Sequence, residues 1–188
     1  MTARPFLFCF GYGYSCDYLG HALMTQESHD AGQSWVIGGT TRDPQKKAAM
    51  RDRGIKSYIF DYEKPLGDAT AFLNGLTHLL ISTPPDDNGD PAFLMHAEDI
   101  AAIPSLQWVG YLSSTSVYGD TGGRPVGEDA PRAATSERGR RRIVAEDAWL
   151  ERHRSAGLPV CIFRLAGIYG PGRLPVARLA AAQAVLEG

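Results

Sequence analysis

Two glycines and a small residue follow the first apolar run of the chain, at a spacing that suits a phosphate ligand. Phe6–Phe10 is long enough for one buried strand and too short for a buried helix. Gly11, Gly13 and Cys16 come next, and a helical pattern of apolar residues follows. In this order the first glycine permits a sharp turn, the second admits a diphosphate, and the small third residue lets the helix pack close to the sheet. The stretch predicts a dinucleotide site, with a purely structural turn as the alternative.

Hydroxyl side chains follow two later apolar runs. Ser113 to Ser116 form a row of four, which is hard to satisfy inside a core and easy to use in a site. Ser82 and Thr83 stand before Pro84-Pro85. Because the two prolines remove backbone donors and stiffen the chain, this segment suits either a wall beneath a ribose or a rigid turn.

Charged residues close two other runs. Thr41 and Arg42 follow Trp35–Gly39, where a carboxylate would bind a ribose 2′-hydroxyl and an arginine would bind a 2′-phosphate. The nearby Asp43 is better explained as a helix cap before Pro44, so the sequence favours NADP over NAD; a solvated surface arginine is the alternative for Arg42. Asp61 ends a further run and can accept from an adenine amino group or cap a turn.

Strand patterns alternate with helix patterns along the chain. Predicted strands cover residues 6–10, 35–39, 57–60, 78–82, 107–113 and 160–165. Predicted helices begin after the first glycines and at Asp43, and cover 66–76, 91–103 and 136–155, with a last alanine-rich helix after Arg173. This alternation predicts an α/β fold, a doubly wound parallel sheet with helices on both faces. We expect one Rossmann domain over residues 1–173, and residues 174–188 to begin a small or truncated segment that covers the substrate.

Composition narrows the classes of partner. The 188 residues carry 19 basic and 21 acidic side chains, a net charge of -2, which favours neither nucleic acid nor a membrane surface. The three cysteines, Cys9, Cys16 and Cys161, read as buried, reduced thiols of a cytoplasmic protein. No apolar span is long enough to cross a membrane, and no histidine or cysteine spacing suits a metal site.

Two further segments carry a family resemblance. SSTSVYGD, from Ser113 to Asp120, and FRLAGIYGPGR, from Phe163 to Arg173, resemble the extended short-chain dehydrogenases/reductases, the NAD-dependent epimerase/dehydratase group. GYGYS and GTTR are similar to an atypical, less characterised branch. The resemblance implies that Ser114 binds the reacting substrate oxygen and that Ala166–Tyr169 lie beside the nicotinamide. It also implies a diphosphate held by Gly11, Tyr12, Gly13, Tyr14 and Ser15.

The chain departs from this family at its catalytic pair. The family places Tyr-x-x-x-Lys on the helix after the fifth strand, where this sequence has Arg138 and Arg142. Arginine keeps its proton, so Arg142 can replace the charge of the lysine but Arg138 cannot replace the proton transfer of the tyrosine. Tyr118 is the nearest tyrosine that could supply a proton, and a packing role is its alternative.

The arginines of this helix have two interpretations. Arg142 can pair with Glu146 one turn on, as on a solvated face. Arg138 and Arg142 are also one turn apart, where like charges repel by about 0.2–0.5 kcal/mol, and an anion between them would relieve this repulsion.

The residues therefore support an NADP-binding oxidoreductase or epimerase/dehydratase that acts on a small, sugar-like or anionic substrate. A non-catalytic NADP(H) sensor is the second hypothesis, because of Arg138, and a Rossmann-like protein without a cofactor is the third. The long charged helix offers a surface for a homodimer.

Overall fold

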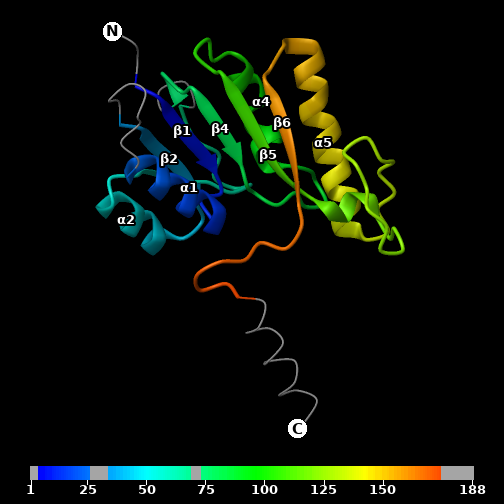
Figure 1. Ribbon diagram of the computed structural model, residues 1–188. Helices are drawn as coiled ribbons and strands as arrows, with labels where there is room; N and C mark the ends of the chain where they lie inside the picture. Colours follow the sequence, from blue (N-terminus) through cyan, green and yellow to red (C-terminus); the bar gives the residue numbers. More distant parts are fainter. Residues whose placement is uncertain (1–3, 26–33, 69–72, 175–188) are drawn as a thin grey trace.

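Six strands of the described residues form one parallel sheet, as the alternating pattern predicts (Figure 1). The computed structural model describes residues 4–25, 34–68 and 73–174. The sheet order is β3-β2-β1-β4-β5-β6, and all five neighbouring pairs are parallel. The order reverses between β1 and β4, and ligands of such sheets bind outside the carboxyl ends of the strands at that reversal. The strands are β1 (Phe6–Phe10), β2 (Val36–Thr41), β3 (Lys56–Ile59), β4 (His78–Ile81), β5 (Trp108–Ser114) and β6 (Val160–Leu165).

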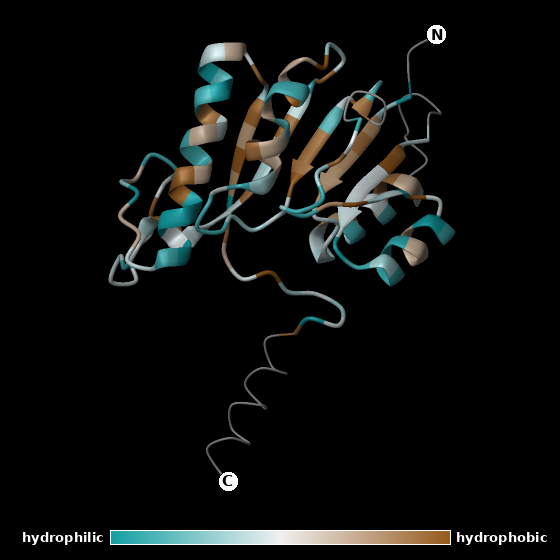
Figure 2. Cartoon of the chain, turned by 180° about the vertical axis from the view of Figure 1, so that it is seen from behind, coloured by the Kyte–Doolittle hydropathy of each residue, from teal (hydrophilic) through white to brown (hydrophobic). Residues whose placement is uncertain are grey.

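Helices cover both faces of this sheet. They are α1 (Tyr14–Thr25), α2 (Pro44–Asp52), α4 (Pro91–Ala101), α5 (Glu137–Ala156) and the short 3₁₀ helix η1 (Thr115–Tyr118). Successive side chains of a strand point to opposite faces. The phenylalanines of β1 therefore pack with α4 and α5, while Leu7 and Cys9 pack with residues of α1 and α2. Figure 2 shows the strands as mostly hydrophobic ribbons between helices whose outer turns are hydrophilic.

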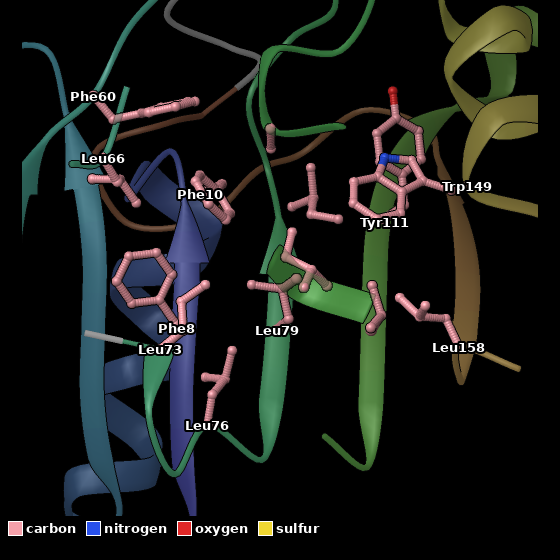
Figure 3. Packing of buried hydrophobic residues seen from close by; sticks show 14 of the residues in the cluster. Phe8, Phe10, Phe60, Leu66, Leu73, Leu76, Leu79, Tyr111, Trp149 and Leu158 are labelled. Atoms are coloured by element: carbon pink, nitrogen blue, oxygen red, sulfur yellow. The ribbon is translucent and has the colours of Figure 1, made fainter. Parts of the chain in front are cut away.

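An aromatic contact holds α5 against the sheet. Trp149 of α5 is fully buried and belongs to the same cluster as Tyr111 of β5 (Figure 3). The Trp149 ring also meets the ring of Phe93 edge to face at 5.0 Å, and its Nε1 donates to a carboxylate oxygen of Asp90 at 2.8 Å. Large buried aromatic side chains dominate packing energetics, so this contact holds α5 against the sheet and α4.

Two sequence expectations are wrong. Cys161 is exposed, although all three cysteines were expected to be buried. Its partner in β5 is Gly110, which lies between Trp108 and Leu112 on the face where α1 and α2 pack. On the same face of β6, Phe163 is 40% exposed. Residues 66–68 are not helical, although a helix was predicted over 66–76.

The remaining differences are small or untested. Residues 69–72 of the predicted 66–76 helix lie outside the described residues. So does the alanine-rich helix predicted after Arg173, from residue 175 on. Among the described residues, no helix has the length and hydropathy needed to span a bilayer.

Candidate functional site

Two cavities open at the carboxyl ends of the central strands. The first has a volume of about 420 Å³ and is lined by eight of the predicted cofactor residues, with Arg42 and Asp61 at one side and Ser82 and Thr83 at the other. The second, of about 220 Å³, is lined by the other three: Tyr14, Ser15 and Ala166. Gly13 and Ser82 line both cavities, so the two cavities lie side by side. The fold thus brings these eleven predicted cofactor residues together.

The glycine turn provides the floor between the cavities. Gly11 has φ +79°, and a Cβ there would lie 3.0 Å from the backbone nitrogen of Thr83. Its own N–H donates to Thr40 Oγ1 at 2.8 Å. A Cβ on Gly13 would meet nothing closer than the carbonyl of Gly11 at 3.8 Å, so the backbone here is open to a ligand. With α1 beginning at Tyr14, these residues fit a diphosphate at a helix N-terminus.

Tyr12 differs from its neighbours in the turn. Its side chain is 2% exposed and packs under α1, where a Cβ on Gly20 would lie 2.3 Å from the tyrosine hydroxyl. Burial raises the pKa of Tyr12. The Tyr12 hydroxyl is therefore not available to a ligand, and its backbone N–H donates to the carbonyl of Thr40 at 2.7 Å.

Two positively charged side chains lie just after β2, and the carboxylate between them in sequence caps α2. The carboxylate of Asp43 accepts from the backbone N–H groups of Gln45 at 2.8 Å and Lys46 at 3.4 Å, which confirms it as the N-cap of α2. Arg42 and Lys46 both line the first cavity. Sequence reasoning missed Lys46. Its position three residues after a predicted N-cap, on the turn nearest the end of β2, was the signal that could have identified it.

Asp61 has the turn-capping role that the sequence left as an alternative. Its Oδ1 accepts from the backbone N–H groups of Glu63 at 2.9 Å and Lys64 at 2.8 Å, while the residue lines the first cavity. Beside it, the hydroxyl of Tyr62 donates to the carbonyl of Gly89 at 2.7 Å, and burial raises the pKa of Tyr62.

Ser114 and Arg142, two of the predicted catalytic residues, line the second cavity. Ser114 Oγ accepts from the N–H of Ser116 at 3.2 Å. Arg142 is 8% exposed, and its Nη1 donates to the hydroxyl of Tyr111 at 3.1 Å and to the carbonyl of Leu112 at 2.5 Å. Three more polar residues line this cavity: Ser113, Arg138 and Arg173. Of these, Arg173 had no role predicted from the sequence.

The expected pairing of Arg142 with Glu146 is wrong. Glu146 is fully buried and accepts from Ser113 Oγ at 2.5 Å, from Arg164 at 2.9 Å and from Arg132 at 3.2 Å. These donors come from β5, β6 and the loop before α5, so helical spacing alone could not reveal them. Hydrogen bonding to Glu146 raises the pKa of Arg164.

Tyr118 does not join Ser114 in the second cavity. It lines a separate hollow of about 320 Å³ beside the 120–131 loop. Its hydroxyl accepts from Arg164 Nη1 at 2.8 Å, and the guanidinium lies 5.0 Å from the ring centroid. This geometry favours the packing role over proton transfer to a ligand near Ser114.

The loop after β6 closes one side of the site. The hydroxyls of Tyr14 and Tyr18 lie 3.1 and 3.5 Å from the carbonyl of Pro171 and donate to it. The guanidinium of Arg173 lies 5.4 Å from the centroid of the Tyr14 ring and borders the second cavity. Figure 1 shows this segment running from β6 across the carboxyl ends of the strands. In the described part of the chain, no cluster of three or more histidine, cysteine or acidic side chains could hold a metal ion.

A family model for the NAD dependent epimerase/dehydratase family matches residues 96–185. Protein YeeZ of Escherichia coli strain K12 is 33% identical over 153 residues, which are 77% of this chain and 54% of that protein. A solved structure described as a functionally unknown conserved protein from Silicibacter pomeroyi DSS is 42% identical, with a TM-score of 0.77, over 94% of this chain and 57% of that one. This chain therefore spans little more than half the length of these relatives.

A more distant solved structure shares the fold. UDP-glucuronic acid 4-epimerase from Bacillus cereus, in complex with NAD, has a TM-score of 0.69 at 17% identity, over 91% of this chain and 60% of that one. At this identity, the likeness concerns the fold alone.

Proposed function

Because the chain belongs to the NAD dependent epimerase/dehydratase family, we propose that it binds a nicotinamide dinucleotide and acts on a small substrate as an oxidoreductase or epimerase/dehydratase. The observation that carries this proposal is the pair of adjacent cavities at the reversal of strand order, which all eleven predicted cofactor residues line. When bound, the nicotinamide would supply hydride chemistry.

The protein groups divide the work between the two cavities. The N–H groups of the first turn of α1 would hold the diphosphate beside Gly13, and the first cavity would take the adenosine half. At the other end, the Ser114 hydroxyl would donate to the substrate oxygen. Nη1 of Arg142 donates to the hydroxyl of Tyr111 and the carbonyl of Leu112, so its other N–H groups are left to donate to ribose hydroxyls.

We further propose that the protein prefers NADP to NAD. Arg42 and Lys46 supply two positive charges at the end of β2, where Asp43, the carboxylate that directly follows Arg42, is engaged by the N-terminus of α2. Two cations suit a 2′-phosphate, and an engaged carboxylate does little to bind a 2′-hydroxyl. The Bacillus cereus epimerase was solved with NAD, so the cofactor choice needs a direct test.

Calorimetric titration of NADPH and NADH tests both points. We expect wild type to bind NADPH at least about tenfold more tightly, since a charge-assisted contact contributes about 1.5–3 kcal/mol. Arg42→Ala and Lys46→Ala should each weaken NADPH and leave NADH unchanged. Arg51→Ala, which removes a charge from the far end of α2, is the matched control and should change neither. Equal affinities in wild type would contradict the NADP preference, and binding of neither dinucleotide would contradict the function.

The NADP(H) sensor remains the second candidate, because Arg138 stands where the family has its tyrosine. The two functions separate in an assay of NADPH oxidation against sugar and carbonyl substrates. Turnover that Ser114→Ala abolishes would support the enzyme. NADPH binding without turnover on any of them would favour the sensor.

We also propose a homodimer through α5. Val144, on the outer side of this helix, is 61% exposed among charged neighbours. Light scattering should give twice the mass of one chain for wild type and the mass of one chain for Val144→Asp. A monomeric wild type would contradict this proposal.

A further inference from the structure

We propose that the second cavity binds an oxyanionic group of the substrate, a phosphate or a carboxylate, between Arg138, Arg142 and Arg173. The assignment of this anion to a substrate rests on the proposed dinucleotide function, because the glycine turn on the other side of the cavity would be taken by the cofactor.

The arginines of α5 fall into two groups. Four of the six form ion pairs: Arg140 with Glu137 at 3.0 Å, Arg154 with Glu151 at 2.8 Å, Arg141 with Asp87, and Arg152 with Glu98. Among the described residues, no carboxylate lies within 4 Å of the two others, Arg138 and Arg142. These two are the α5 arginines that line the cavity. The unpaired charges therefore face the site, and the paired ones face elsewhere.

Arg142 makes this arrangement costly without a ligand. It is 8% exposed, and the partners of its guanidinium are neutral: a phenol, a carbonyl and the ring of Tyr111, with its centroid at 5.6 Å. A buried charge is expensive unless an opposite charge is close. The buried carboxylates around it serve other groups. Glu146 holds Arg132 and Arg164, while Asp90 accepts from Trp149 Nε1 at 2.8 Å and from the N–H of Ala92 at 2.9 Å.

Asp90 does respond to Arg142. Burial raises the pKa of Asp90, and the charge of Arg142 acts in the opposite direction. The two groups therefore attract each other across a distance longer than an ion pair. This leaves the guanidinium of Arg142 able to bind an anion that enters from the cavity.

The rest of the cavity has the same character. Its lining contains three arginines and four serines and no aspartate or glutamate. Arg173 reaches it from the loop after β6, with its guanidinium held over the ring of Tyr14. At about 220 Å³ the cavity lies below the roughly 300–1,000 Å³ of sites for larger ligands, so it suits a small group. Guanidinium groups match the planar and forked geometry of carboxylate and phosphate oxygens.

This site suits electrostatic stabilisation rather than proton transfer. Guanidinium groups keep their protons throughout the physiological range. At the place of the family tyrosine, Arg138 can therefore hold a negatively charged substrate oxygen but cannot protonate it. The substrate class that fits is a small molecule with a phosphate or carboxylate close to its reacting carbon.

Anion titrations on the protein saturated with NADPH test the proposal, with inorganic phosphate and malonate as separate probes at constant ionic strength. We expect one of the two to bind to wild type, and its affinity to fall at least tenfold in Arg138→Ala and in Arg173→Ala. Both side chains are exposed, so neither variant should disturb folding. Arg140→Ala, two residues along α5 from Arg138 and paired with Glu137, is the matched control and should stay within twofold of wild type. The probe that binds tells phosphate from carboxylate.

The outcomes separate this proposal from the proposed function. Failure of both probes to bind NADPH-saturated wild type, or equal binding to wild type and Arg138→Ala, would overturn the anion site while NADPH binding stands. If the protein bound no dinucleotide, the titrations would be made without it. A loss in Arg138→Ala would then support the anion site and refute the cofactor, and binding independent of Arg138 would overturn both.

Discussion

Gly11 and Gly13 lie two residues apart and have different structural roles. Gly11 has a positive φ and lies against the backbone at Thr83, so its lack of a side chain serves the fold. Gly13 has no close neighbour around the position of a Cβ, so its lack of a side chain leaves room for a ligand.

Alanine at each position should separate these roles. Gly11→Ala should lower the free energy of unfolding by about 1–3 kcal/mol, because of the strained φ and the contact with Thr83. Gly13→Ala should leave the unfolding free energy within about 1 kcal/mol and still weaken NADPH binding at least about tenfold, since the Cβ would stand where the diphosphate approaches. Urea denaturation and calorimetry measure the two quantities. Unchanged NADPH affinity in Gly13→Ala would contradict the placement of the diphosphate.

Rules based on sequence spacing predicted the roles of residues with local partners, and failed for residues whose partners are far away in sequence. The cap at Asp43 was predictable because its partners lie two and three residues away in sequence. The partners of Glu146 come from positions 14 to 33 residues away, so the spacing rule assigned Arg142 to it wrongly. Arg173 was missed for the same reason, because its place in the cavity depends on Tyr14 at the other end of the chain.

At the scale of elements, Glu146 joins three of them. This buried carboxylate accepts from β5 through Ser113, from β6 through Arg164 and from the loop before α5 through Arg132. Arg132 also reaches Asp147, the next residue of α5, at 2.6 Å, but Asp147 is exposed. Two adjacent carboxylates, one buried and one exposed, thus bind the same arginine.

Matched amide substitutions should reveal the difference. Glu146→Gln should lower the free energy of unfolding by about 3–5 kcal/mol, because it leaves partly buried guanidinium groups without their charge partner. Asp147→Asn should cost about 0–1 kcal/mol, as exposed ion pairs do. Thermal and urea denaturation of the two variants provide the measurement. Equal losses would show that burial does not govern this network.

The elements themselves were largely predictable. The strands at 6–10 and 160–165 have the predicted bounds, and the ends of the other four shift by at most two residues. β2 runs on through Thr41, because Thr40 and Thr41 pair with β3 despite the preceding glycines. The apolar pattern at 66–76 predicted a helix wrongly at its start, because Leu66 is buried although its segment is not helical. The backbone N–H of Leu66 donates to His96 Nε2 at 3.2 Å.

At the scale of the whole molecule, the two faces of the sheet are unequal. One face packs against α4 and α5, whereas the described helices of the other face, α1 and α2, cover the part near β1 and β2. Trp108 and Phe163, with ring centroids 5.9 Å apart, lie at the less covered end together with Cys161. Parallel strands are normally buried on both faces, and that rule misled the prediction for Cys161.

This asymmetry predicts how the thiols react. Cys161 should react with a maleimide or disulfide reagent in the folded protein, while Cys9 and Cys16, both fully buried, should react only after denaturation. Absorbance or mass spectrometry should therefore give one rapid equivalent, and Cys161→Ser should remove it. Three rapid equivalents in the native protein would contradict the packing around β1 and α1.

The contact of Pro171 with Tyr14 and Tyr18 has a consequence for synthesis on the ribosome. Residues 11–15 emerge early, yet Arg173 and the carbonyl of Pro171 must arrive before the mouth of α1 is complete. A nascent chain that has emerged only as far as β5 would display the glycine turn with one wall missing. The proposed nucleotide would then bind tightly only after about 160 further residues had left the exit tunnel. Binding would therefore be a late event in the synthesis of each molecule.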